Sequence, residues 1–332
     1  MNDSTFHSTF RSKVTVVKQS FVISFVAAAL IGPAAFAWGP EGHQTVGELA
    51  RTLLSQKARN EVKMILHDDD LAALATWADE VRAASRGKGP LVNDASVAQF
   101  NTAHPHNDKW HFVNLPLDIP SYPQTGEFAS GEDVVHAINR CVAVLEKQST
   151  EFSKRDALAL LVHFVGDIHQ PLHVGTGYYK FDDAGIIELI TDPIKAAGRP
   201  DDVGGNDLFY GPSRFDELHG FWDGELVKNV ADTTSYHKLT IFLTNKVDNA
   251  AWKSTGNHHH WADAWAEDSL KVASSAYRDL RFKEATFNAH HGLRQITIDL
   301  PDRYTEIHTK EVETQLAKAG FHLAELLNAI KW

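Results

Sequence analysis

Residue types that bind metal ions are concentrated in an eleven-residue stretch that begins at His163. His163 and Asp167 are four residues apart, so in a helix both side chains project from one face about one turn apart. Pro171 cannot continue a helix and disfavours helical geometry in the preceding residue, so we expect the helix to end near His169. His173 then follows the end of the helix, where it can reach a different metal. Imidazole and carboxylate ligands without thiols are typical of a catalytic zinc site.

Further candidate ligands are scattered along the chain. His219 and Asp223 repeat the His-x-x-x-Asp spacing on a second predicted helix. Asp79 and Arg82 are three residues apart and share a helix face, and His111 lies in a short extended piece. Taken singly, Asp79 and Arg82 are typical of an exposed ion pair. Two His-x-x-x-Asp helices in one chain favour a metal site instead.

The first 37 residues have the features of an export signal. Three basic residues precede an apolar run that ends in a small-x-small cleavage motif at 35–37. The run is short for a membrane span, which needs about 20 apolar residues, so a retained anchor is the less favoured alternative. Cleavage after residue 37 would make Trp38 the new amino terminus and leave 38–332 as the functional domain.

Composition restricts the class of protein. Nothing in 38–332 has the composition of a linker, so one domain is expected. The single cysteine, Cys141, excludes an intrachain disulfide and favours a bacterial periplasmic or secreted protein. The formal charge of −11 becomes −13 without residues 1–37, which opposes a general DNA-coating role. Bound divalent cations would reverse the charge locally, so an enzyme acting on phosphates remains possible.

Apolar residues three and four positions apart predict a mainly α fold, a single compact helical domain with long loops. The segments with this pattern are 38–65, 71–81, 131–149, 153–169, 215–229, 233–249, 260–280 and 306–330. Residues 83–109 and 174–212 are rich in Gly, Pro, Asp and Asn and are predicted to be loops. Residues 295–299 carry the only clear strand pattern. The histidines at 258–260 are adjacent, cannot share one helix face, and are expected to be solvated.

These motifs, in this order, resemble the S1/P1-type zinc-dependent nucleases, which are single-strand-specific nucleases with 3′-nucleotidase activity. The matching segments are Trp38-Gly with His43, WADEVR at 77–82, WHFVN at 110–114, HFVGDIHQPLH at 163–173, GGND at 204–207, LHGFWD at 218–223, WAEDS at 265–269 and QLAKAGFHLAELLN at 315–328. The family fold is mainly α, which agrees with the helical pattern.

The resemblance implies three zinc ions per chain. The first would be held by Asp79, His111, His163 and Asp167, the second by His173, His219 and Asp223, and the third by the amino nitrogen and carbonyl oxygen of Trp38 with His43 and a bridging Asp167. A terminal amine exists at Trp38 only after signal removal, so export would complete the site.

The resemblance also implies the reaction. A zinc-activated water would attack phosphorus in line, and single-stranded DNA, RNA and 3′-mononucleotides would be substrates, with 5′-phosphates left on cleaved strands. Asp79 would orient the water, and Arg82 would stabilise charge on the phosphate oxygens. Asn114, Asn206 and Tyr178 are candidate substrate-binding residues, and Asn114 stands where some relatives have a base-binding Asp. No stable protein partner is implied, nor any membrane association after signal cleavage.

Two other functions fit the ligand pattern. A zinc-dependent phospholipase C has a similar three-zinc helical site, but that group carries Glu where this chain has Asp223. A non-catalytic periplasmic zinc-binding protein is the second alternative. Arg82 opposes it, because a cation beside a metal site disfavours metal binding unless an anionic substrate is present.

Overall fold

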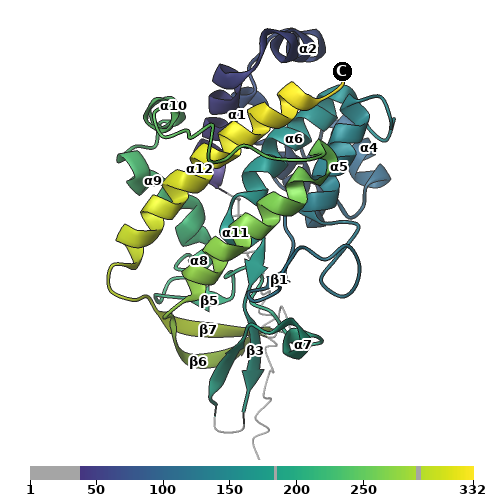
Figure 1. The fold of residues 1–332 in the computed structure, drawn as a ribbon. Coiled ribbons are helices and arrows are strands. Elements are labelled where there is room, and N and C mark those ends of the chain that lie inside the picture. The colour runs from purple at the N-terminus through teal and green to yellow at the C-terminus, as the bar shows by residue number, and fades with distance from the viewer. Residues whose placement is uncertain (1–37, 183–184, 289–292) are drawn as a thin grey trace, which may run out of the picture. The chain divides into compact units, whose positions relative to one another are not determined.

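The computed structural model describes residues 38–332 except 183–184 and 289–292. The predicted signal peptide lies outside the described residues, so its cleavage and the domain boundary at Trp38 stay predictions. Helices dominate the described part, as the sequence predicts (Figure 1). The α-helices are α1 (Gly39–Leu53), α2 (Gln56–Leu66), α3 (Trp77–Ser85), α4 (Ala95–Ala103), α5 (Val134–Leu145), α6 (Lys154–Ile168), α7 (Pro193–Ala196), α8 (Leu218–Gly220), α9 (Leu226–Ala231), α10 (Tyr236–Thr244), α11 (Trp261–Tyr277) and α12 (Tyr304–Ala329).

Helix α6 forms the centre of the hydrophobic core. Every residue from Ala157 to Ile168 is buried, and the helix contacts α5, α1 and α12. A helix that is buried on all sides is typical of a core position, and its two ligand-type side chains, His163 and Asp167, are fully buried. The hydroxyl of Ser153 accepts the Asp156 amide and starts the helix. Pro171 begins a 3₁₀ turn that ends at His173, so the predicted end of the helix is confirmed.

Several predicted helices differ in their bounds. The segment 38–65 divides into α1 and α2, because the Ser55 hydroxyl caps a new helix by accepting the Ala58 amide. The segment 71–81 divides into a 3₁₀ turn (Ala72–Leu74) and α3. The predicted loop 83–109 contains α4, whose Asp94 side chain caps two amides of its first turn.

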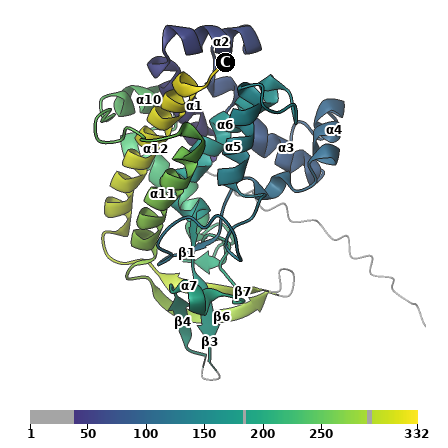
Figure 2. The same ribbon diagram turned by 45° about the vertical axis from the view of Figure 1, so that its right-hand side comes forward.

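The strands form small sheets. Strand β1 (Leu115–Pro116) pairs in parallel with β2 (Gly175–Thr176), and β3 (Tyr178–Phe181) pairs antiparallel with β4 (Ile187–Ile190). The third sheet has the order β5-β7-β6, with β5 (Leu208–Phe209), β6 (Arg281–Asn288) and β7 (Leu293–Asp299). Residues 295–299 lie in β7 as predicted, whereas the prediction that 174–212 is all loop is wrong. Figure 2 shows β3, β4, β6 and β7 gathered away from α2. In the described residues, no helix has both the length and the hydropathy that a membrane span requires.

Candidate metal centre

Four predicted ligands from three segments meet at helix α6. His111 Nδ1 lies 3.1 Å from His163 Nε2 and 3.0 Å from Asp167 Oδ2. Asp79 Oδ1, from helix α3, lies 3.8 Å from His111 Nδ1 and 3.7 Å from His163 Nε2. Ligand atoms of a tetrahedral zinc site, at about 2.0–2.1 Å from the ion, are about 3.3 Å apart. The distances between these donor atoms are close to that value, so the four buried side chains are candidates for one site, which we call the first cluster.

The first cluster requires positive charge. His163 Nδ1 donates to the Ala75 carbonyl at 2.7 Å, so its Nε2 is the atom that faces the carboxylates. Burial lowers the pKa of His163, but Asp167 and Asp79 outweigh burial and raise it to about 9. Burial lowers the pKa of His111 to about 4, so this ring is neutral and has a lone pair to offer. A cation among these groups would take the place of the proton on His163.

Three further ligands form a second cluster at the exit of α6. His173 Nδ1 donates to the His111 carbonyl at 2.6 Å, and His219 Nδ1 donates to the Gly204 carbonyl at 2.7 Å. Both Nε2 atoms of the neutral rings therefore carry lone pairs, and they face each other at 3.1 Å. Asp223 Oδ2 lies 3.3 Å from His219 Nε2. Two lone pairs at this distance repel, and a cation bound between them would turn the repulsion into ligation.

The second cluster is held by an irregular helix and a buried amide. Asp223 lies in a π-helical turn (Phe221–Glu225) between α8 and α9, a geometry that is frequent at functional sites. Gln170 Nε2 donates to Asp223 Oδ1 at 2.7 Å, while Gln170 Oε1 accepts the Leu172 amide at 2.6 Å. Burial raises the pKa of Asp223 well above its usual range, and the Gln170 bond opposes that rise. Sequence reasoning missed Gln170, although its place between ligands in the 163–173 stretch was a usable signal.

His43 brings a third group of side chains to Asp167. His43 Nε2 lies 3.4 Å from Asp167 Oδ1, the oxygen that faces away from the first cluster, so this carboxylate can bridge two ions. The ring of His43 packs directly on Gly166, where a Cβ would meet His43 Nδ1 at 2.6 Å. Glycine at 166 is therefore needed for this approach.

Trp38 is anchored beside these clusters. Its buried indole donates Nε1–H to the Gly166 carbonyl at 2.8 Å, and its backbone nitrogen donates to Asp223 Oδ1 at 3.3 Å. Its carbonyl accepts the Gly42 amide at 3.1 Å in the first turn of α1. The backbone nitrogen of Trp38 thus contacts a residue of the second cluster, and its carbonyl oxygen would have to share a hydrogen bond in order to ligate.

A small cavity joins the predicted catalytic arginine to the second cluster. It has a volume of about 40 Å³ and is lined by Arg82, Phe112, Asn114, Leu172, His173, Val203, Asn206 and His219. Arg82 Nη1 lies 3.9 Å from Asp79 Oδ1, and its buried Nε has no hydrogen-bond partner among the described residues. Arg82, Asn114 and Asn206 therefore line one cavity with two metal-ligand candidates, which is an arrangement suited to an anion.

Tyr178 lies in a neighbouring cavity of about 230 Å³ that Asn114 also lines. Its hydroxyl donates to the Asn114 carbonyl at 2.9 Å, and its ring meets Phe128 edge-on with centroids 5.6 Å apart. The Asn114 side chain donates to Asp201 Oδ2 at 3.3 Å. The Asp201 carboxylate, in the 178–202 segment, therefore lies beside Asn114, the residue that stands where some relatives have a base-binding Asp.

Other histidines lie outside the clusters. His169 Nε2 contacts His322 Nδ1 at 2.7 Å, so this ring faces α12. The prediction that the 258–260 histidines are solvated is wrong for two of them, because His258 and His259 both contact buried Glu146.

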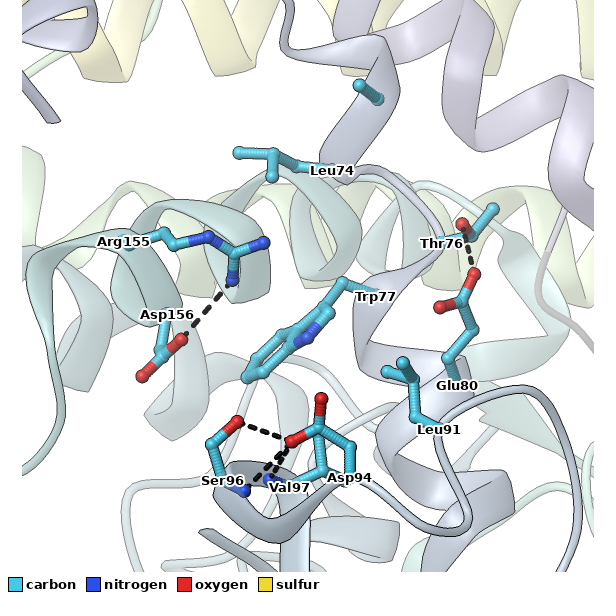
Figure 3. A pocket seen from close by; sticks show the side chains of 11 residues that line it. Leu74, Thr76, Trp77, Glu80, Leu91, Asp94, Ser96, Val97, Arg155 and Asp156 are labelled. Atoms are coloured by element: carbon cyan, nitrogen blue, oxygen red, sulfur yellow. Dashed lines mark hydrogen bonds and ion pairs between the residues drawn. The ribbon is translucent and has the colours of Figure 1, made fainter. Parts of the chain in front are cut away.

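A larger cavity, of about 480 Å³, contains none of the clustered ligands (Figure 3). Trp77 stands at its centre, with Arg155 and Asp156 on one side and Glu80 on the other. Three carboxylates, from Glu80, Asp94 and Asp156, line it against one guanidinium, so its charge does not suit a polyanion.

A mainly α domain with buried His/Asp clusters beside a cavity-lining arginine has the architecture of a metal-dependent phosphoesterase. Residues 38–331 match the family model described as S1/P1 Nuclease, and the chain belongs to this family. It is 27% identical to Endonuclease 2 of Arabidopsis thaliana, over 88% of this chain and 90% of the relative. It is 26% identical to Nuclease P1 of Penicillium citrinum, over 88% and 97%, and 23% identical to Nuclease S1 of Aspergillus oryzae, over 89% and 92%. Members of this zinc-dependent family are hydrolases of phosphodiester bonds in single-stranded nucleic acids.

Proposed function

We propose that the chain from Trp38 is a zinc-dependent endonuclease and 3′-nucleotidase that hydrolyses single-stranded DNA and RNA to products with 5′-phosphates. The observation that carries this proposal is the pair of facing Nε2 atoms of His173 and His219, 3.1 Å apart, in a cavity that Arg82 also lines. A cation site and an anion site thus share one small space, which suits a metal-bound phosphate.

The clustered side chains carry donor atoms that zinc binds, and we assign them to three ions. The first ion would be held by Asp79, His111, His163 and Asp167, the second by His173, His219 and Asp223, and the third by Trp38, His43 and Asp167. When bound, the ions would lower the pKa of water and neutralise charge on phosphate.

The residues of the chain supply the remaining chemistry. Asp79, whose Oδ1 lies 3.7 Å from His163 Nε2, would help to hold the first ion and would also orient the attacking water. The Arg82 guanidinium, 3.9 Å from Asp79, would bind phosphate oxygens as their charge increases.

The neighbouring cavity would favour single strands. An unpaired base would enter this space of about 230 Å³, which Phe112, Phe128 and Tyr178 line, and stacking there would contribute about 1–3 kcal/mol per base. Asn114 would contact the base edge, with Asp201 as the neighbouring acceptor. A base in a duplex would first have to leave its stack.

We place this activity outside the cytoplasm, in the periplasm or medium of a bacterium, on the basis of the export features in residues 1–37. Removal of that segment would convert the Trp38 amide nitrogen, which lies at Asp223, into a terminal amine able to ligate zinc.

A substrate panel tests the proposal. Zinc-loaded protein that begins at Trp38 is given single-stranded DNA, the matching duplex, a 3′-mononucleotide and phosphatidylcholine, each with and without a chelator. We expect chelator-sensitive hydrolysis of the single strand and of the 3′-mononucleotide, slower hydrolysis of the duplex, and none of the lipid. Hydrolysis of the lipid alone would identify a phospholipase C, and zinc binding without any hydrolysis would identify a zinc-binding protein.

A further inference from the structure

A second group of potential metal ligands lies apart from the metal centre. It consists of Glu146, His258 and His259, and we propose that these three side chains form a separate zinc site. It shares no residue with the three clusters, and in the described part of the chain none of the hydrogen bonds and ion pairs of Glu146 reaches them.

The donor atoms have the spacing of a zinc site. His258 Nε2 lies 2.9 Å from Glu146 Oε1, and His259 Nε2 lies 3.1 Å from Glu146 Oε2. One atom from each residue can be chosen so that all three lie within 4.8 Å of one another, and the two imidazole centroids are 4.4 Å apart. In a tetrahedral zinc site the ligand atoms are about 3.3 Å apart, and two histidines with one glutamate, with the fourth position left to water, are a known protein ligand set.

The site is formed in advance by its surroundings. Glu146 directly follows α5, its side chain is 1% exposed, and those of His258 and His259 are 11% and 30% exposed. The Glu146 carboxylate also accepts the Lys331 amide at 3.0 Å and the Gln148 side-chain amide at 2.8 Å, which fix its orientation. One side of the site is thus rigid and buried, while the His259 side is open to an entering ion.

The local backbone explains how neighbouring histidines converge. Residues His258–His260 form a 3₁₀ turn before α11, not part of an α-helix, and the Asn257 side chain caps that turn at the His259 amide. Two consecutive rings can then face one carboxylate, whereas His260 faces Asp263 and is 70% exposed.

Zinc at this site would join segments that are far apart in the sequence. Glu146 and His258 are separated by 112 positions, and the Lys331 amide brings the C-terminal residues to the same carboxylate. A ligand that binds the folded chain alone raises its stability, so the site is expected to reinforce the packing of α5, α11 and the C-terminal residues.

Calorimetric titration of the zinc-loaded holoenzyme with Zn²⁺ tests the proposal. The wild-type protein should take up one further equivalent after its metal centre is filled, and its thermal unfolding midpoint should rise. His259→Ala should lose that equivalent or bind it at least tenfold more weakly. Hydrolysis of single-stranded DNA, which does not involve this residue, should be unchanged. His260→Ala is the matched control and should retain wild-type uptake, because that exposed side chain lies outside the site.

A second variant separates ligation from folding. Glu146→Gln keeps the shape of the side chain but removes its charge and replaces one acceptor oxygen with an NH₂ group, and should also lose the extra equivalent. The proposal is overturned if the wild-type holoenzyme takes up no further zinc, or if His259→Ala takes up as much as His260→Ala. Because zinc uptake is the readout, the result is independent of whether the protein proves to be a nuclease.

Discussion

The hydrogen bond from Gln170 to Asp223 determines how the second cluster is oriented, and Gln170→Leu removes it. The bond is 2.7 Å long, buried, and made to a carboxylate. In the metal-free protein, burial raises the pKa of Asp223 and favours its neutral form, so this bond contributes about 0.5–1.5 kcal/mol. The Leu172 amide, which Gln170 accepts at 2.6 Å, would be left unpaired at a further cost of about 1–3 kcal/mol. We therefore expect the free energy of unfolding of the metal-free protein to fall by about 3 kcal/mol.

Gln170→Leu should also lower the affinity for zinc. Loss of a residue that orients a ligand typically costs 10- to 100-fold in metal affinity, so one of the bound zinc ions should weaken by about that factor. Competition with a chromophoric chelator measures the affinity, and urea unfolding in excess chelator measures stability. Gln124→Leu is the control, because that side chain makes the same kind of bond to Asp263, at 3.1 Å, on the exposed surface. Equal zinc affinity and stability in the Gln170→Leu and Gln124→Leu proteins would refute the role of Gln170.

Four further substitutions, one of them a control, have definite expected outcomes. In Gly204→Ala, a Cβ would meet the Leu172 carbonyl at 2.2 Å at a φ of +62°, so we expect a loss of about 3 kcal/mol in urea unfolding, together with lost activity. Gly198→Ala, with a φ of +69° and nothing within 4 Å, should cost only about 1 kcal/mol and leave activity intact. Burial and neighbouring carboxylates raise the pKa of Asp207 to about 7. Between about pH 4 and pH 7 the folded chain therefore holds a proton on this carboxyl that the unfolded chain has released. The free energy of unfolding consequently falls as the pH rises through this range. Asp207→Asn should therefore match the wild type near pH 4 and exceed it at pH 8, by at most about 4 kcal/mol, whereas an equal difference at both pH values would contradict the assignment. Asp201→Asn should reduce cleavage beside guanine, which can offer two N–H donors to a carboxylate, by about tenfold relative to other bases, and unchanged rates on four homopolymers would exclude a base contact.

Helix α6 was predictable because the residues that determine its start, its apolar pattern and its end lie within or next to the helix itself. The apolar pattern of 153–169, the serine that starts it and Pro171 that follows it all act within a few residues. The β3–β4 hairpin was not predictable in this way, because glycine- and aspartate-rich composition concealed two short strands that are stabilised by pairing with each other.

The ligand sets required more than periodicity. Spacing alone linked His163 to Asp167 and His219 to Asp223, whereas the approach of Asp79 and His111 to α6 depends on tertiary packing and came only from the resemblance to a family. The contacts of Glu146 with His258 and His259 could not be predicted from the sequence. They join residues 112 positions apart and depend on a 3₁₀ turn that has no clear sequence pattern.

Zinc-edge anomalous diffraction from crystals of the protein that begins at Trp38 would locate each ion without reference to activity. Three zinc ions held as proposed would give three peaks within the metal centre. One should lie among the four side chains of the first cluster, one between His173 and His219, and one beside His43 and the Trp38 amine. If no peak lies between His173 and His219, the proposal of a metal-dependent site fails, because it rests on the facing Nε2 atoms of that pair.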